Sequence, residues 1–347
     1  LYPRVAGILS RAIGRQLTSV ECCLLIDEAA VTIVAGNIRR SAGMRQFTSN
    51  DSLAASAKEN LWQQDQEGNW RIDPNRDALR MANHTRVYHT RPTLKEINDA
   101  VTKQFHSGEG AIQFAPEAIA RSNSDLLITK ELREEFIEIY CDQGKEQAKK
   151  WLQTLHGPIS PRELEHRLSR YGLNPCGEIL GADFHCNLAE VHLNQIKPSD
   201  KEEQAKAFRA AGLSVACLLN HRFEVARYRE SRSFDPIVGV SFTGLFDFFV
   251  HAFGTPWLKW WEEGRPNSEE GKNFKSQEAA FLKEWKDIVN KTVWEYCDKH
   301  NLRRPNRCTT VQPAGTKSLL TGAAPGWHPP KAQRFIRRIT FRKSDPV

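Results

Sequence analysis

The segment Asn174-Pro175-Cys176-Gly177-Glu178 constrains this chain more than any other stretch, because it sets a thiol two residues from a carboxylate. Pro175 fixes its own φ angle and biases Asn174 toward an extended conformation. Gly177 lets the chain bend between the cysteine and the glutamate. We therefore predict a tight loop in which both side chains converge on one small molecule. Because Cys186 follows shortly downstream, the segment indicates redox or radical chemistry on a polar substrate.

Two other interpretations of these residues stay open at this point. A cysteine is usually a small buried apolar residue and Pro-x-Gly is common in turns, so the loop is also consistent with a purely structural role. The second alternative is a zinc site formed by Cys176, His185, Cys186 and His192. The chain contains no Cys-x-x-Cys pair, which makes zinc the weaker interpretation.

Charge and hydropathy narrow the classes of partner. The 347 residues carry a net charge of +7, with a pI near 9.0, which favours an anionic ligand such as a nucleotide. The basic residues are dispersed, apart from a cluster within 334–343, and do not interleave with aromatic residues, so a nucleic-acid interface is not predicted. No apolar run approaches the roughly eighteen residues of a membrane span. Eight cysteines at irregular spacing favour a reducing, cytosolic compartment over a disulfide scaffold.

Strand-like and helix-like segments alternate along the chain, which predicts an α/β architecture. Asp27 is expected to cap one helix, and the capping box Thr93-Leu94-Lys95-Glu96 opens another. The charged helical stretch before Asn174 has the character of an insertion. Strands are expected at 44–47, 82–89, 111–114 and 307–312, and helices at 27–35, 93–105, 130–170, 202–223 and 276–300.

A second candidate site follows the strand predicted at 307–312. The order there is a β-branched run, then a Pro/Gly turn, then two hydroxyls and a lysine, which suits a phosphate group. Its residues are Pro313, Ala314, Gly315, Thr316, Lys317 and Ser318. The spacing is not that of a Walker A loop, and an ordinary capped turn is the alternative.

Taken together, these motifs resemble the ribonucleotide reductases, and most closely the adenosylcobalamin-dependent class. Asn174–Glu178 matches the family's finger loop, and Gln312–Ser318 looks like its substrate-phosphate loop. The segment 36–42 is similar to the family's specificity loop, with Asn37, Arg39, Arg40 and Ser41 facing effector and substrate base. Gly108-Glu109-Gly110 resembles a further recurrent segment of the family.

The resemblance implies a ten-stranded α/β barrel of the radical-enzyme type, here incomplete. Residues 1–129 would be the end of the first half-barrel with the specificity loop. Residues 130–173 would be a helical insertion, and 174–347 the finger loop with part of the second half-barrel. The chain would thus be the central part of a reductase, acting with the remaining segments of that protein.

By the same resemblance, Cys176 would carry a thiyl radical and Glu178 would act as general base on the ribose. Asn174 would hydrogen-bond the ribose hydroxyls, and Cys186 would be half of the reducing thiol pair. The implied cofactor is adenosylcobalamin, with no bound metal site of the chain's own. Implied partners are a ribonucleoside di- or triphosphate substrate, dNTP or ATP effectors and a thioredoxin-type reductant, with no membrane and no nucleic acid.

Two departures from the family pattern affect this expectation. The partner of Cys186 should lie well upstream of the specificity loop, whereas Cys22 and Cys23 lie shortly before it. A C-terminal thiol pair, which would re-reduce the site, is absent from the sequence. The alternatives are therefore a non-catalytic nucleotide-binding fragment of a split or truncated reductase, or a reductase with another radical source, such as a di-metal partner subunit or a glycyl radical.

Overall fold

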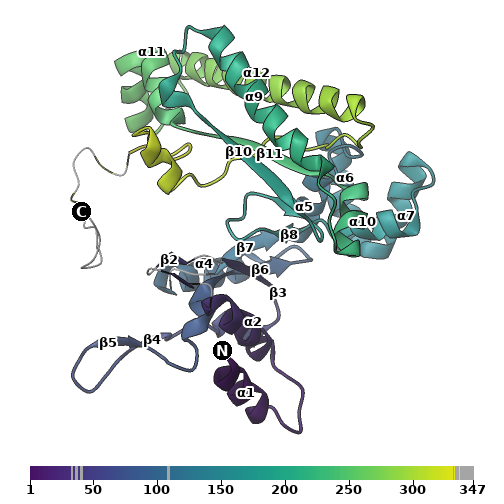
Figure 1. Ribbon diagram of the computed structural model, residues 1–347, viewed down its shortest axis with the longest axis vertical. Helices are drawn as coiled ribbons and strands as arrows, with labels where there is room; N and C mark the ends of the chain where they lie inside the picture. Colours follow the sequence, from purple (N-terminus) through teal and green to yellow (C-terminus); the bar gives the residue numbers. More distant parts are fainter. Residues whose placement is uncertain are drawn as a thin grey trace. The chain divides into compact units, whose positions relative to one another are not determined.

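The structure is a computed structural model that describes residues 1–32, 34–35, 38–39, 42–107, 110–330, 332 and 336 (Figure 1). The chain divides into two compact units. Unit 1 comprises 1–186 and 222–237, and unit 2 comprises 187–221 and 238–347. Helices and strands occur in both units, which confirms the predicted α/β class. The first division between the units falls at 186/187.

A parallel sheet of three strands, in the order β3-β6-β7, organises unit 1. Its strands are β3 (Gly43–Thr48), β6 (Ala82–Tyr88) and β7 (Ala111–Phe114), each within a residue or so of its predicted position. The helix α4 (Leu94–Ser107) connects β6 to β7, and the predicted capping box opens it. Thr93 Oγ1 accepts from the Glu96 amide at 3.2 Å, while the Glu96 carboxylate accepts from the Thr93 amide at 2.8 Å. Parallel strands need such crossovers because their ends lie far apart.

The crossover from β3 to β6 is longer. It contains α3 (Ser52–Ser56), the antiparallel hairpin β4 (Trp62–Gln64) with β5 (Trp70–Ile72), and the 3₁₀ turn η1 (Asp77–Met81). Asp51 caps α3, accepting from the Ala54 amide at 2.9 Å.

The N-terminal helices differ from the prediction. These are α1 (Tyr2–Arg11) and α2 (Ser19–Val31), and α2 begins at a capping box formed by Thr18 and Glu21. Asp27 therefore lies inside α2 and does not cap a helix. Its side chain is buried and forms an ion pair with Arg45 of β3, a contact that local sequence does not reveal. The short strands β1 (Val34–Ala35) and β2 (Ile38–Arg39) follow as an antiparallel pair.

Helices complete unit 1, and most of the stretch 130–170 is helical as predicted. These helices are α5 (Ala115–Ser122), α6 (Lys130–Gln143), α7 (Lys145–His156), α8 (Pro161–Leu168) and α10 (Ala226–Phe234). Phe136, Leu152 and Leu164 are fully buried in their shared core. Arg170 is also buried, and it contacts Asp235 at 3.3 Å.

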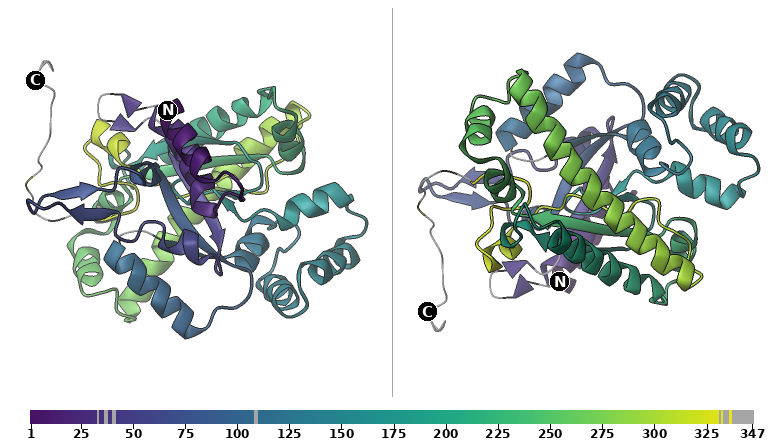
Figure 2. Two further views of the ribbon diagram at one scale, coloured as in Figure 1. Left: turned by 90° about the horizontal axis from the view of Figure 1, so that it is seen from below. Right: turned by 90° about the horizontal axis from the view of Figure 1, so that it is seen from above.

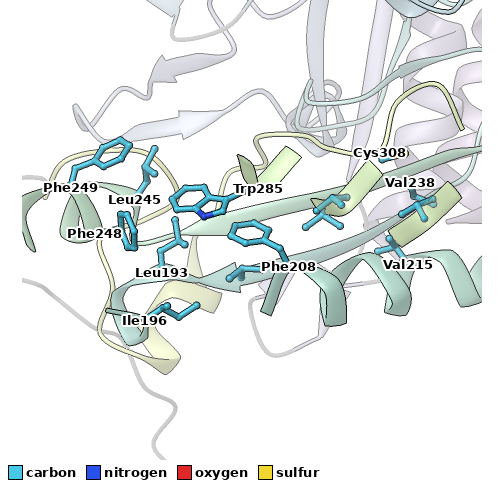
Figure 3. Close-up of a cluster of buried hydrophobic side chains, with 14 of the residues drawn as sticks. Leu193, Ile196, Phe208, Val215, Val238, Leu245, Phe248, Phe249, Trp285 and Cys308 are labelled. Atoms are coloured by element: carbon cyan, nitrogen blue, oxygen red, sulfur yellow. The ribbon is translucent and has the colours of Figure 1, made fainter. Parts of the chain in front are cut away.

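Unit 2 is built on the paired strands β10 (Cys186–His192) and β11 (Ile237–Thr243). Helices α9 (Lys201–Cys217) and α12 (Glu269–Lys299) pack side by side on this sheet (Figures 1 and 2). Phe208 of α9 stacks on Trp285 of α12 with ring centroids 5.0 Å apart, within the apolar core drawn in Figure 3. Predicted helices at 202–223 and 276–300 are thus confirmed, with α12 starting earlier than expected.

The remaining helix, α11 (Leu245–Glu262), is kinked because Gly254 adopts a φ of 72° and Pro256 follows it. The kink lets Trp257 pack against Phe246, with ring centroids 5.2 Å apart. No helix within the described residues is long and apolar enough to cross a membrane.

The stretch after α12 is less regular than predicted. Instead of a strand over 307–312, Thr309 makes an isolated parallel bridge to Val240 of β11. The hydroxyl-rich segment that follows is the short 3₁₀ turn η4 (Thr316–Leu320) and not the start of an α-helix. The 307–312 strand prediction was therefore wrong, because β-branched composition alone does not supply pairing partners.

Candidate functional site

The predicted tight loop around Cys176 is present in unit 1. It joins the short antiparallel strands β8 (Gly172–Leu173) and β9 (Leu180–Gly181). The Gly177 amide donates to the Asn174 carbonyl at 2.9 Å, which closes a turn with Pro175 and Cys176 at its centre. Gly177 has a φ of +76°, a conformation that glycine adopts without strain. Cys176 is exposed at the apex of the turn.

Asn174 closes the loop with its own side chain. Its Oδ1 accepts from the Ile179 amide at 3.0 Å, and its backbone amide donates to the Ile179 carbonyl at 3.4 Å. The side-chain oxygen is thus committed to the loop, and the amide nitrogen is the part that remains for a ligand. The hydrogen bonds of Asn174 therefore preform the turn before any ligand binds.

Two glutamines, which we call the amide clamp, hold this loop on the parallel sheet. Gln46 of β3 accepts from the Leu173 amide at 2.8 Å and donates to the Tyr171 carbonyl at 3.0 Å. Gln113 of β7 donates to the same carbonyl at 2.9 Å and accepts from Gln46 at 2.6 Å. Asn83 of β6 adds a bond from its side-chain nitrogen to the Pro175 carbonyl. Sequence reasoning missed these residues, because nothing local marks a glutamine as a clamp.

The loop lines a cavity of about 630 Å³ within unit 1. Cys176 and Glu178 contribute to its wall from the loop, while Asn83, Ile112 and Phe114 contribute from the sheet. This volume falls in the range of small-molecule sites, which usually combine apolar walls with a few polar groups. The structure therefore brings Cys176 and Glu178 to one cavity, as the sequence predicted.

His84 of β6 also borders this cavity and is 5% exposed. Burial, together with the nearby charges of Lys58 and Arg45, lowers its pKa to about 3. The imidazole is therefore neutral at physiological pH, because desolvation disfavours the cation. A neutral ring can accept a hydrogen bond from a ligand or a water without adding charge beside Cys176.

The other cysteines flagged by sequence lie in different elements. Cys186 is half-buried and begins β10. Cys22 and Cys23 lie in α2, where burial raises the pKa of the Cys23 thiol. Within the described part of the chain, no group of three or more histidine, cysteine and acidic side chains could hold a metal ion. The zinc interpretation of Cys176, His185, Cys186 and His192 therefore receives no support.

The predicted phosphate loop lies in unit 2. Pro313, Gly315, Thr316 and Lys317 are exposed, whereas Ala314 and Ser318 are each 2% exposed. Ser318 donates to the Ala314 carbonyl at 3.0 Å, so its hydroxyl stabilises the loop from inside. Lys317 forms an ion pair at 3.1 Å with Glu190 of β10, a buried residue that sequence reasoning did not single out.

The predicted specificity loop falls mostly outside the described residues. Asn37, Arg40 and Ser41 are not described. Arg39 contributes its backbone to β2. Gly108 and Glu109 likewise lie outside the described residues, whereas Ile112 and Phe114 are part of β7.

Comparison with known proteins gives one consistent result. No family model matches the chain. An adenosylcobalamin-dependent ribonucleoside-triphosphate reductase of Levilactobacillus brevis is 28% identical over 353 residues, covering 98% of this chain and 40% of the relative. Its counterpart in Lacticaseibacillus paracasei is 27% identical over 354 residues, with the same coverage. The chain thus spans about 40% of the length of the curated relatives it matches.

A solved structure supports the same fold. The crystal structure of a B12-dependent, class II ribonucleotide reductase matches with a TM-score of 0.57 at 18% identity, covering 93% of this chain and 39% of that one. The resemblance inferred from the sequence motifs is therefore confirmed by relatives found over nearly the whole chain.

Proposed function

We propose that this relative of the adenosylcobalamin-dependent ribonucleotide reductases forms part of an enzyme that converts ribonucleotides to 2′-deoxyribonucleotides. One observation carries the proposal: an exposed cysteine at the apex of a clamped loop shares a nucleotide-sized cavity with a glutamate. The relatives' names indicate a ribonucleoside triphosphate as substrate. We extend the proposal to the fold, with the two units contributing to the ten-stranded barrel that the resemblance implies.

Cys176 is the proposed hydrogen-atom acceptor from the ribose 3′ carbon. Its position at the turn apex exposes the thiol to the cavity. Adenosylcobalamin would supply the initiating radical, because side chains alone do not cleave such a C–H bond. The amide clamp keeps the Cys176 sulfur in a fixed place relative to the sugar.

Glu178 is the proposed general base for the 3′-hydroxyl. It lies beside Cys176 in the same cavity wall, which suits removal of a proton from the carbon's own hydroxyl group. Asn174 would bind a ribose hydroxyl through its side-chain nitrogen, because its oxygen already accepts from the Ile179 amide.

Loss of the 2′-hydroxyl as water requires two electrons and two protons, which a pair of thiols provides on becoming a disulfide. Cys186 is the proposed member of that pair within this chain. A thioredoxin-type reductant would restore both thiols. The Pro313–Ser318 loop would bind the substrate phosphates through Thr316 and Lys317, both of which are exposed. Effectors of the dNTP or ATP type would act through the specificity loop.

Protection of Cys176 from alkylation tests the proposal on the chain itself. A ribonucleoside triphosphate should slow iodoacetamide labelling of Cys176 at least about tenfold at saturation, because the sugar would cover the thiol. Cys217, an exposed cysteine at the end of α9, is the internal control and should label at an unchanged rate. Equal labelling of Cys176 with and without nucleotide would contradict the site.

Catalysis is tested by measuring how much deoxynucleotide forms under anaerobic conditions with adenosylcobalamin and a dithiol. The assay uses the longest polypeptide that contains this chain. Cys176→Ser should abolish product, because a hydroxyl O–H bond is too strong to relay the radical. Glu178→Gln should lower kcat by about 10²–10⁴, as expected for loss of a general base, with little change in substrate binding. Product from the serine variant at wild-type rates would refute the assignment.

A further inference from the structure

One face of β10 holds both ends of the Pro313–Ser318 loop. Side chains two residues apart on a strand point to the same side, so Glu190 and His192 share a face. The Glu190 side chain is 4% exposed, and its carboxylate accepts from the Gln312 side-chain amide. Gln312 immediately precedes the loop and is itself 4% exposed. The same carboxylate pairs with Lys317 near the other end of the loop at 3.1 Å.

His192 contacts the turn that follows the loop. Its Nδ1 lies 2.7 Å from Thr321 Oγ1, and its Nε2 lies 3.9 Å from Glu190 Oε1. Asn194 donates to the Thr321 carbonyl at 2.9 Å. The turn that follows η4 is therefore tied to the same stretch of chain as the loop itself.

We propose that Glu190 is a positioning residue for this loop. We also propose that its carboxylate is a counter-charge, which reduces the positive charge that Lys317 presents to a ligand. The inference rests on the proposed phosphate-binding role of the loop. A buried carboxylate with two partners fixes Gln312 and Lys317 relative to each other, and thereby sets the width of the exposed segment between them. Bonds to a charged acceptor are stronger than neutral ones, so this contact adds to the bonds of the short 3₁₀ turn in holding the loop.

The counter-charge role follows from the same geometry. Lys317 has a half-exposed side chain and is the cation of the loop, yet its ammonium is already paired with Glu190. An arriving phosphate must share that ammonium with a buried carboxylate of like charge to itself. The buried carboxylate therefore lowers the affinity of the loop for phosphates, and lowers it most for the most highly charged ones. It also holds the Lys317 side chain toward β10 when no ligand is bound.

Two substitutions separate position from charge. Glu190→Ala removes both the hydrogen-bond acceptor and the charge. Glu190→Gln keeps one side-chain oxygen as an acceptor for Gln312 and Lys317 but removes the charge. Glu190→Ala should weaken binding of ATP about tenfold or more, the equivalent of one lost charge-assisted bond, without changing adenosine binding. Glu190→Gln should restore ATP affinity to at least the wild-type value. It should also widen the preference for ATP over AMP, because the more highly charged ligand gains more when the carboxylate charge is removed. Glu202→Gln, which alters an exposed carboxylate on α9 paired with Lys206, is the matched control.

Amide hydrogen exchange over 314–320 tests the positioning role without any ligand. Exchange should be faster by about tenfold in Glu190→Ala and close to wild type in Glu190→Gln. Unchanged exchange in both variants, or equal acceleration in both, would overturn the inference. If exchange responds as expected while wild-type chain binds ATP and adenosine alike, the phosphate role of the loop is wrong and the positioning by Glu190 stands. Calorimetric titration with ATP, AMP and adenosine completes the comparison.

Discussion

Gln46→Leu should loosen the cysteine loop while leaving the parallel sheet intact. Leucine fills a similar volume, so the substitution removes hydrogen bonds and creates little cavity. Three contacts disappear: the acceptor for the Leu173 amide at 2.8 Å, the donor to Tyr171 at 3.0 Å and the donor to Gln113 at 2.6 Å. Each net hydrogen bond contributes roughly 1 kcal/mol, so we expect the β8–β9 hairpin to lose about 2–3 kcal/mol of local stability.

Hydrogen exchange of the hairpin amides measures this loss directly. A local destabilisation of about 2–3 kcal/mol corresponds to exchange faster by roughly 30- to 150-fold. Gln113→Leu removes the donor to Tyr171 but leaves the Leu173 bond, so its effect should be smaller. Gln63→Leu on the exposed strand β4 is the control and should have no effect on the hairpin. Equal exchange in Gln46→Leu and Gln63→Leu would show that the clamp does not hold the loop.

Three further predictions concern unit 1. Because the pKa of His84 is lowered from 6.5 to about 3, the unfolded chain takes up a proton that the folded chain does not as pH falls below 6.5, and stability should drop by about 2 kcal/mol by pH 5. Urea titrations at several pH values should show that His84→Gln reduces this dependence. Gly177→Ala should cost about 1–2 kcal/mol in hairpin exchange, because φ is +76° there while no atom lies within 4 Å of the added carbon; an unchanged rate would contradict a rigid turn. Asp235→Ala should lower the free energy of unfolding by about 3–5 kcal/mol, since it leaves the buried Arg170 guanidinium without its carboxylate; a loss below about 1 kcal/mol in the same titration would show that the pair matters little.

Local chemistry made much of unit 1 predictable from sequence. The capping box at Thr93 and the cap at Asp51 act through bonds to residues three positions away, so a short window contains all the information. The turn around Cys176 was predictable for the same reason, since Pro175 and Gly177 restrict their own backbone angles.

Long-range pairing accounts for what sequence did not reveal. Asp27 has the composition of a helix cap, yet its carboxylate is buried against Arg45 of a strand, and no local signal indicates that contact. Lys317 was expected to offer its charge to a phosphate, but Glu190, far away in the chain, already pairs with it. The sequence does not identify Gln46 and Gln113 as clamp residues either, because an uncharged amide on a strand is most often a surface residue.

The amide clamp has a consequence for the order in which the site is assembled during synthesis. The turn around Cys176 needs only neighbouring residues, whereas its attachment to the sheet joins Leu173 to Gln46, 127 positions earlier, and Tyr171 to Gln113, 58 positions earlier. Closing the longer loop costs only about 0.6 kcal/mol more for each doubling of length, but it must wait until both segments have left the ribosome. A nascent chain can therefore form the turn, with its exposed thiol, before the position of that thiol relative to the sheet is fixed.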